Sequence, residues 1–498
     1  MVFESILNPK KKGGDHYRSF TMPASFYDLN LDGVMKEIKL IAGDYEVQNY
    51  FYELPGLTET IYYRQGVCKD LENPAVYNGV ITFTEDMKRA REFMENAGQS
   101  TMRLQKECWA MNSAYFYCRS VRKLLHTLQE ANLSGKGFLS LLDWLEEFIK
   151  GERFLTMEKE TKRLMDLFSQ IRYSITIESD KIRLSREAFE GEWESGLGEM
   201  ENPYGSILAL SKLEEIALSM LEKSDKNGFV QFHEYYETYH DFMNETLLLF
   251  EQEIFFYVSY MKYIDKLGKE GFVFSYPEIT EQTFEGYQCY DMALARKNSS
   301  EGKSVVRNDI TYEPGEKFFV ITGPNQGGKT TFARAMGHVV YFSLLGLKAP
   351  GENLKIPLFR DVITHFATEE SVMTGSGKLK EELDRLAPMM KKCYGRNFVL
   401  INELFTTATT YDALIMGNRV MKHFMDKDCL GIYVTHIKEL AGGREGVTSL
   451  VASVSEQDSH LRTYKMKRQK PEGIGYASDI VDKYDLSLDC LRRRLSLC

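Results

Sequence analysis

The chain has 498 residues, 43% of them hydrophobic and 27% charged, an ordinary globular composition with room for about two to four domains. Its formal net charge is -10. Dedicated nucleic-acid binders are usually basic, so any DNA contact requires a local basic surface. No apolar run is long enough for a membrane span or a secretory signal, and the eight cysteines include no CxxC pair. We therefore expect a cytoplasmic protein without membrane, zinc or disulfide chemistry.

The region from about 80 to 268 is predicted to be helical. Between Pro74 and Pro277 there is a single proline, Pro203, where average usage predicts roughly ten. Apolar residues recur every three or four positions in the segments 113–133, 139–157, 206–224 and 233–270. The last of these predicts one helix of 38 residues. The helices either extend as one long region or form a compact bundle, and the pattern allows both.

From about 270 the pattern changes to short runs rich in β-branched and aromatic residues. They are "GFVFSYPEIT", "KFFVIT", "NFVLI", "LGIYVT", "SLVASVSEQ" and "HLRTYKM". Helix-compatible segments separate most of these runs, which is typical of an α/β domain with a mainly parallel sheet. The boundary is expected near 270–300.

The strongest motif is a phosphate-binding loop. Gly323 and Gly328 frame four residues and are followed by Lys329 and Thr330, which is the GxxxxGK[ST] pattern. An apolar strand precedes the loop and a helix-compatible segment follows it. Glycines let backbone N–H groups turn toward phosphates, the lysine neutralises them, and the threonine hydroxyl suits Mg²⁺.

Two later strands end in polar residues that fit the same chemistry. "NFVLI" ends in Asn402-Glu403, where a nucleotide-hydrolysing protein usually carries Asp-Glu. The first position serves the Mg²⁺ shell, and the second orients or deprotonates the attacking water. "LGIYVTHIKEL" places His436 at the end of another strand, where a histidine can sense the γ-phosphate.

These residues resemble the DNA mismatch repair protein MutS and its relatives. "ITGPNQGGKTT" resembles the family's phosphate loop, "NELFTTATTYDA" its acidic strand end, "YVTHIKEL" its histidine strand end, and "GIGYASDIVDKYDL" the close of its ATPase domain. "ETIYYRQGVCKDL" and the long helices resemble the family's core and levers. The resemblance spans about 50–498 and is strongest over 300–480.

The resemblance implies a multidomain fold in which an all-α core and lever region precedes an α/β P-loop ATPase domain of the ABC type. The expected divisions are an N-terminal segment at 1–49, a helical core, lever and clamp region at 50–295, and the ATPase domain at 296–498.

The resemblance also implies a set of site residues. Glu403 is expected as the catalytic carboxylate and His436 as the γ-phosphate sensor. Thr330 would hold Mg²⁺ directly and Asn402 through water. Val305 or Val306 would contact the adenine, and Asp412 would face a second subunit. The remaining residues expected to bind ATP are Gly323, Pro324, Asn325, Gln326, Gly327, Gly328, Lys329 and Thr331.

The family works as dimers, so a homodimer is expected, with Ser376 of "MTGSGKLKEELDRL" reaching the other subunit's phosphates. Two departures modify the expectation. Asn402 is neutral, which predicts looser Mg²⁺ binding and slow hydrolysis. Residues 1–49 are too few for the family's mismatch-reading domain, so a shortened, divergent relative is expected.

Three functions remain open at this stage. The first is an ATP-dependent clamp on mismatched or branched double-stranded DNA, acting in mismatch repair or control of recombination. The second is a related clamp acting on RNA or the ribosome. The third is a P-loop ATP-binding protein whose helices serve a protein partner. ATP and Mg²⁺ are the expected cofactors.

Overall fold

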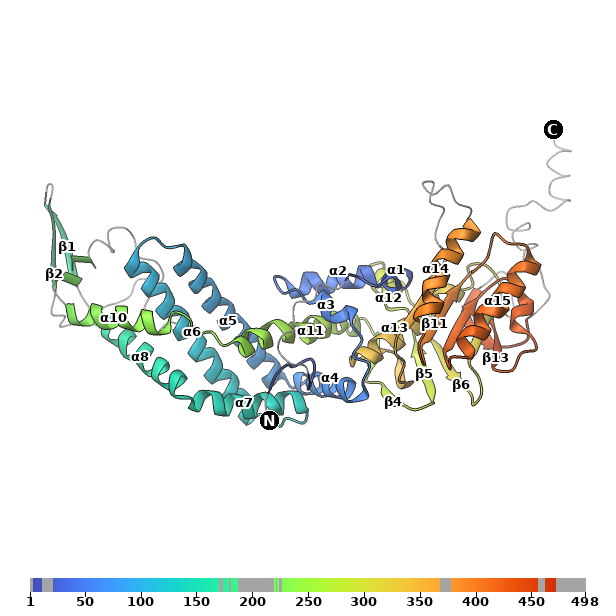
Figure 1. The fold of residues 1–498 in the computed structure, drawn as a ribbon, viewed down its shortest axis with the longest axis horizontal. Helices are drawn as coiled ribbons and strands as arrows, with labels where there is room; N and C mark the ends of the chain where they lie inside the picture. Colours follow the sequence, from blue (N-terminus) through green and yellow to red (C-terminus); the bar gives the residue numbers. More distant parts are fainter. Residues whose placement is uncertain are drawn as a thin grey trace, which may run out of the picture. The chain divides into compact units, whose positions relative to one another are not determined.

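The computed structural model describes residues 3–10, 21–169, 173–178, 181–186, 219–220, 222–223, 226–367, 378–455 and 462–471 (Figure 1). The chain divides into two compact units. Unit 1 comprises Met1–Lys11 and Gly66–Glu253, and unit 2 comprises Lys12–Gln65 and Ile254–Cys498. The expectation of a helical region followed by an α/β region is confirmed at this level. The division at 1–49, 50–295 and 296–498 is a different partition and stays a prediction.

Unit 1 is built mainly from helices. Within it lie α5 (Pro74–Gln99), α6 (Arg103–Glu130), α7 (Lys136–Lys150), α8 (Glu152–Ser169) and α10 (Lys226–Tyr239). Two further helices contain the unit boundaries, α4 (Thr58–Leu71) and α11 (Glu245–Gly268). No helix in the described ranges is both long and apolar enough to cross a bilayer.

The pairing of α5 with α6 shows why these residues form long helices. Asn73 caps α5 by accepting a hydrogen bond from Ala75 N, and Pro74 occupies the first helical position, where its missing N–H costs nothing. Asp86 of α5 is buried and accepts two hydrogen bonds from the Arg119 guanidinium of α6, at 2.7 and 3.1 Å. A buried carboxylate held by a two-pronged donor fixes the register of the two helices.

The helix boundaries differ from the sequence-based expectation at two places. The single helix predicted over 233–270 is wrong, because the chain leaves α10 after Tyr239 and enters α11 at Glu245. Asn244 begins the new helix, its side chain accepting from Thr246 N at 2.9 Å. The segment 139–157 is likewise divided at Gly151 between α7 and α8. Most of 206–224 lies outside the described residues.

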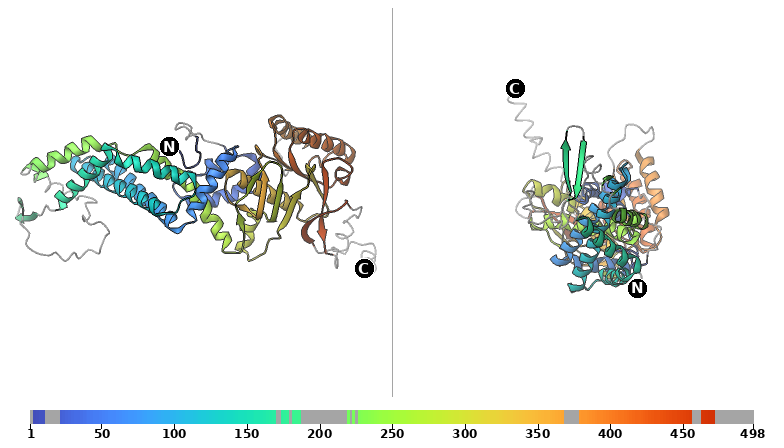
Figure 2. Two further views of the ribbon diagram at one scale, coloured as in Figure 1. Left: turned by 90° about the horizontal axis from the view of Figure 1, so that it is seen from below. Right: turned by 90° about the vertical axis from the view of Figure 1, so that its left-hand side faces the viewer.

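Unit 1 also contains an antiparallel hairpin that the helical pattern did not predict. Strands β1 (Tyr173–Glu178) and β2 (Lys181–Arg186) pair from Tyr173 opposite Arg186 to Glu178 opposite Lys181, and Figure 2 shows the two strands side by side. The alternation in "YSITIE" is a strand signal of period two, which the neighbouring helical periodicity obscured.

Unit 2 is organised around a mixed sheet, which in the described residues has six strands in the order β10-β11-β12-β7-β13-β14. The pairs from β10 to β13 are parallel, and β14 runs antiparallel to β13. The bounds are β7 (Phe318–Thr322), β10 (Val362–Phe366), β11 (Phe398–Asn402), β12 (Leu430–Val434), β13 (Val447–Val454) and β14 (Arg462–Arg468).

Both faces of this sheet are covered, as parallel strands require. Side chains alternate along a strand, so Val399 and Ile401 of β11 pack with α14 (Lys378–Lys392) and α15 (Thr410–Met425) in one apolar core. Leu400 faces the other way, toward Gly337 of α13 (Lys329–Leu345). The sheet is therefore a central layer between α13 and the α14–α15 pair (Figure 1).

Smaller sheets complete unit 2. A four-stranded sheet in the described residues has the order β4-β9-β5-β6, and β3 pairs with β8. Their bounds are β3 (Phe274–Ser275), β4 (Glu278–Thr280), β5 (Phe284–Cys289), β6 (Asn308–Tyr312), β8 (Ala349–Pro350) and β9 (Glu352–Pro357). Helix α12 (Met292–Ser300) and the short 3-10 helix η1 (Lys438–Ala441) fill the connections.

The early helices α1 (Ala24–Asp28), α2 (Leu31–Ala42) and α3 (Gln48–Tyr52) belong to unit 2. The carbonyl of Leu29 accepts a 2.7 Å hydrogen bond from Nε2 of His338 on α13, while Nδ1 of that ring accepts from Met292 N. Burial lowers the pKa of His338, in keeping with this neutral tautomer. Tyr341 of α13 donates to the carbonyl of Phe51. Residues 24–52 therefore pack along α13.

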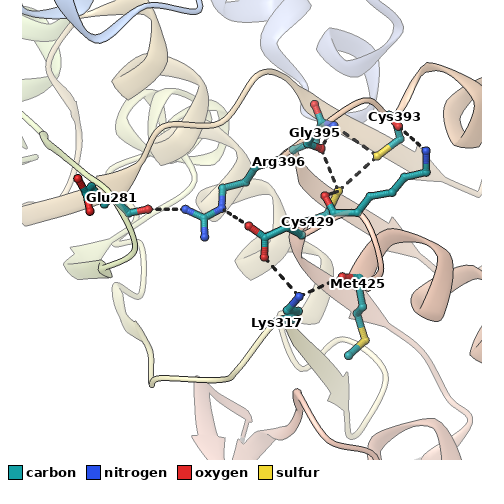
Figure 3. Close-up of polar contacts among 10 residues, drawn as sticks. Glu281, Lys317, Cys393, Gly395, Arg396, Met425 and Cys429 are labelled. Carbon is teal, nitrogen blue, oxygen red and sulfur yellow. Dashed lines mark hydrogen bonds and ion pairs between the residues drawn. The ribbon is translucent and has the colours of Figure 1, made fainter.

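At the amino ends of β7, β11 and β12, ionic contacts join the loops (Figure 3). Asp428, just before β12, bridges Lys317 at 3.3 Å and Arg396 at 3.2 Å, and Arg396 also donates to the carbonyl of Glu281. Beside them the thiols of Cys393 and Cys429 lie 3.3 Å apart. Burial raises the pKa of Cys429 to about 12, so this thiol stays protonated and unreactive at neutral pH.

We predict that Leu29→Ala destabilises unit 2 by roughly 2–5 kcal/mol, because Leu29 is fully buried against Gly337 and its loss leaves a cavity. Leu40→Ala is the matched control, since Leu40 is 82% exposed and should change stability by less than about 0.5 kcal/mol. Calorimetry of the full chain measures both. Equal melting temperatures for the two variants would show that α1 does not stabilise α13.

Candidate nucleotide-phosphate site

The carboxyl ends of three parallel strands lie in one row. Asn402 at the end of β11 is opposite Val434 of β12, which is opposite Ile321 of β7. The residues after these strand ends are therefore neighbours, although they are far apart in the sequence. This edge of an open α/β sheet is where such domains place their ligands.

The loop between β7 and α13 requires its glycines. Gly323 has φ 121° and Gly328 has φ 86°, left-handed values that disfavour a side chain. A Cβ at Gly323 would lie 3.0 Å from the backbone nitrogen of Ala452. Gly328 is the N-cap of α13 and supplies no side-chain cap. The first N–H groups of α13 thus remain available for an anion, together with the positive end of the helix dipole.

Lys329 lies inside this loop. It is 5% exposed, and its ammonium donates to the carbonyls of Gly323 at 3.0 Å and Pro324 at 2.9 Å. Burial lowers the pKa of Lys329, and the Glu403 carboxylate raises it in part. A buried ammonium held by two weak acceptors gains a stronger partner when a phosphate enters.

Thr330 connects the loop to β11. Its hydroxyl donates to Oδ1 of Asn402 at 2.8 Å, and Asn402 is 8% exposed. A hydroxyl and an amide oxygen side by side are hard oxygen donors of the kind Mg²⁺ accepts. The pair fits the metal that accompanies bound nucleotide phosphates, with one negative charge fewer than an Asp would supply.

Glu403 and His436 form a second pair at the same edge. Nε2 of His436 donates to Oε1 of Glu403 at 3.0 Å, since the carboxylate can only accept. This hydrogen bond is the largest cause that lowers the pKa of Glu403. Burial opposes it, and the charges of His436 and Lys329 lower the pKa further. Glu403 is therefore ionised at neutral pH and protonates only as the pH falls through that lowered value.

A cavity of about 1020 Å³ is lined by residues 325–328 of the loop and by Lys329, Thr330, Glu403 and His436. Asn402 is joined to this lining by its hydrogen bond from Thr330. Its lining also includes Leu294, Val305, Val306 and Tyr464. The volume and the mixture of polar and apolar lining suit a ligand that has both a charged and a flat part.

Tyr464 is a cavity residue that the sequence analysis missed. It has φ 57° on the edge strand β14, and its ring lies 3.2 Å from where a Cβ on Gly328 would be. Asn308 holds this strand, donating to the carbonyl of Tyr464 at 3.1 Å and accepting from Met466 N at 3.0 Å. The alternation of "RTYKMKR" predicts a strand but carries no signal for this turned backbone.

The other predicted residues have mixed positions. Asn325 and Gln326 are exposed at the tip of the loop, and Thr331 is half-buried in the first turn of α13. Asp412 is exposed and pairs with Thr409 at the start of α15. Ser376 lies outside the described residues.

The fold and the site define a class: an α/β domain with a glycine-rich anion-binding loop at a helix start, facing polar strand ends. Residues 319–478 match the protein family described as MutS domain V. This region of the chain is therefore similar to MutS domain V, as its motifs indicated.

Individual relatives are similar over limited segments. The DNA mismatch repair protein MutS of Fervidobacterium nodosum is 25% identical over 202 residues, 40% of this chain and 24% of the relative. That of Thermosipho melanesiensis is 25% identical over 158 residues, 31% of this chain and 19% of the relative. The DNA mismatch repair protein MSH3 of Arabidopsis thaliana is 30% identical over 138 residues, 27% of this chain and 13% of the relative. The matched segments span about a quarter of the relatives' length or less.

Proposed function

We propose that this chain is a P-loop ATPase of the ABC type that binds ATP with Mg²⁺ and couples slow hydrolysis to a DNA-binding clamp. The observation that carries the ATPase proposal is the cavity lined by Lys329, Thr330 and the Glu403–His436 pair, with Asn402 bonded to Thr330. Lys329 suits the phosphate charge, the Thr330–Asn402 pair suits the metal, and the Glu403–His436 pair suits the attacking water. MutS domain V is also the family described for this region.

Each residue has a distinct task in the proposed reaction. The loop N–H groups and Lys329 bind the phosphates, and Lys329 exchanges its carbonyl partners for them. Thr330, and Asn402 through water, would hold Mg²⁺, which would supply positive charge to the phosphates. Glu403 orients the attacking water and accepts its proton. His436 keeps Glu403 ionised and in place, and its N–H can turn to the terminal phosphate. Val306 and its neighbours cover the base.

Asn402 is the reason to expect slow hydrolysis. It keeps the oxygen that Thr330 contacts but lacks the charge of Asp, and charge count sets much of a site's affinity for a divalent cation. Glu403, on which the chemistry depends more directly, is present and ionised. The arrangement favours holding ATP over rapid turnover.

We expect Glu403→Gln to reduce the ATPase rate by roughly 100-fold or more while ATP binding remains, because the proton acceptor is lost and the phosphate contacts are not. A fluorescent ATP analogue measures binding and phosphate release measures turnover. Glu445→Gln, at an exposed position outside the cavity, is the charge-matched control and should leave both unchanged. Full turnover in Glu403→Gln would remove Glu403 from the mechanism.

For Asn402→Asp we expect the Mg²⁺ concentration at half-maximal ATPase rate to fall roughly three- to tenfold, since the new carboxylate strengthens the metal shell. The measurement is a Mg²⁺ titration at saturating ATP. Asn418→Asp on α15, which adds the same charge outside the cavity, serves as the control. An unchanged titration in Asn402→Asp would exclude Asn402 from the metal shell.

The DNA part of the proposal rests on the family and on the helical unit. The relatives matched here are described as DNA mismatch repair proteins, and unit 1 supplies long helices of the kind expected for levers. We propose that a homodimer closes around mismatched or branched double-stranded DNA, with Ser376 of each subunit directed at the other's ATP. Phosphate contacts would supply most of the affinity.

We expect the protein to bind a mismatched duplex or a four-way junction more tightly than linear duplex, with a response to ATP. Affinity should fall steeply between about 50 and 200 mM salt as counterions are released. Gel-shift or anisotropy titrations with these DNAs and an RNA hairpin make the comparison. Binding to RNA alone would favour a clamp on RNA or the ribosome. No binding to either at low salt would leave a protein partner as the function.

A further inference from the structure

The turn that carries Glu403 has an unusual backbone. Glu403 has φ 54° and Phe405 has φ 63°, so two non-glycine residues within three positions adopt left-handed conformations, which are costly for residues with a Cβ. Leu404 and Phe405 are each 2% exposed. Surrounding contacts must therefore hold this turn, and with it the direction in which Glu403 points.

Three hydrogen bonds hold the turn: one to β12, one within the turn and one to α14. Glu403 N donates to the carbonyl of Val434 on β12 at 2.9 Å, and Ala408 N donates to the carbonyl of Phe405 at 3.1 Å. The third bond is made by a side chain: Phe405 N donates to Oε2 of Glu382 on α14 at 3.1 Å. Because the first two bonds join backbone groups, Glu382 is the contact among the three that a substitution can remove.

Glu382 is buried among polar and charged side chains. Glu382 is 5% exposed, and burying a carboxylate is costly unless it has partners. Tyr433 of β12 lies close enough that the Glu382 charge adds to burial in raising the pKa of its hydroxyl. His365 of β10 is fully buried, and burial together with Arg385 lowers its pKa to about 4. His365 is thus neutral at pH 7, and Arg385, also on α14, is the cation acting on it.

The position of α14 gives the bond a further consequence. This helix begins at Lys378, directly after the segment that contains Ser376, the residue proposed to reach the second subunit. Glu382 is in the second turn of the same helix. Through its hydrogen bond to Phe405 N, Glu382 therefore connects α14 to the turn that carries Glu403.

We infer that Glu382 is a positioning residue: through its hydrogen bond to Phe405 N it sets the turn that aims Glu403 and links that turn to α14. The inference rests on the proposed function in assigning Glu403 the role of proton acceptor. The bond itself stands on the geometry of the turn alone.

The test compares Glu382→Met, which keeps the volume but removes the acceptor, with Glu382→Gln, whose amide oxygen can still accept from Phe405 N. Asp384→Ala, at an exposed acidic position of the same helix, is the control. We expect Glu382→Met to lower kcat about tenfold or more, since a misdirected catalytic group loses rate steeply. The KM and the affinity for a fluorescent ATP analogue should change less than about twofold. Glu382→Gln and Asp384→Ala should stay close to the wild type.

Amide hydrogen exchange over residues 403–408 provides a second readout that does not depend on ATP hydrolysis. Exchange in this segment should be faster in Glu382→Met than in the wild type, Glu382→Gln and Asp384→Ala. Unchanged exchange in Glu382→Met, or a loss of ATP affinity as large as the loss of kcat, overturns the inference. If the wild type hydrolyses no ATP, the proposed function fails, and exchange alone then decides whether Glu382 holds the turn.

Discussion

The shared level at which β7, β12 and β11 end is the constraint on which the site depends. Their parallel register places Ile321, Val434 and Asn402 in one row, so the phosphate loop, His436 and Glu403 emerge side by side. A one-residue slip would turn each strand's side chains to the opposite face. Because β11 and β12 are buried along their length, the apolar layers on both faces of the sheet resist such a slip. The apolar core thereby also fixes the relative positions of the loop, His436 and Glu403.

The two polar pairs at this edge divide the electrostatic work. The Thr330–Asn402 pair is neutral and binds the loop to β11. The negative charge lies on Glu403, the residue after Asn402, and Glu403 accepts a hydrogen bond from His436. Under the proposed function, the charge on Glu403 would keep the proton acceptor ionised, and the neutral Asn402 would hold Mg²⁺ weakly. Such a site would bind phosphates mainly through the loop and Lys329, with the metal as a weaker contributor.

Helix α13 is buried along most of its length, which fixes the position of the loop at its start. Nearly every residue from Phe332 to Leu345 is buried. Gly337 lets both Leu29 and Leu400 pack close to the helix backbone at one place. The neutral His338 ties it to the backbone of Leu29. A helix held in this way keeps the N–H groups of its first turn pointing in one direction. Such preorganised donors bind an anion with little further loss of conformational entropy.

The sequence by itself determined the local chemistry. The spacing of Gly323, Gly328, Lys329 and Thr330, the strand ends at Asn402–Glu403 and His436, and the change from helical to β-type periodicity near 270 are all local patterns, and local patterns are legible without a fold. Only the tertiary structure decided what contacts them. It broke the helix expected over 233–270 at Asn244, brought residues 24–52 onto α13, turned Tyr464 toward Gly328, and placed Glu382 under Phe405. Each of these features depends on residues far apart in the sequence or on a left-handed backbone angle. Neither produces a periodic pattern in the sequence, because burial and backbone strain depend on what packs around a residue rather than on its neighbours in the chain.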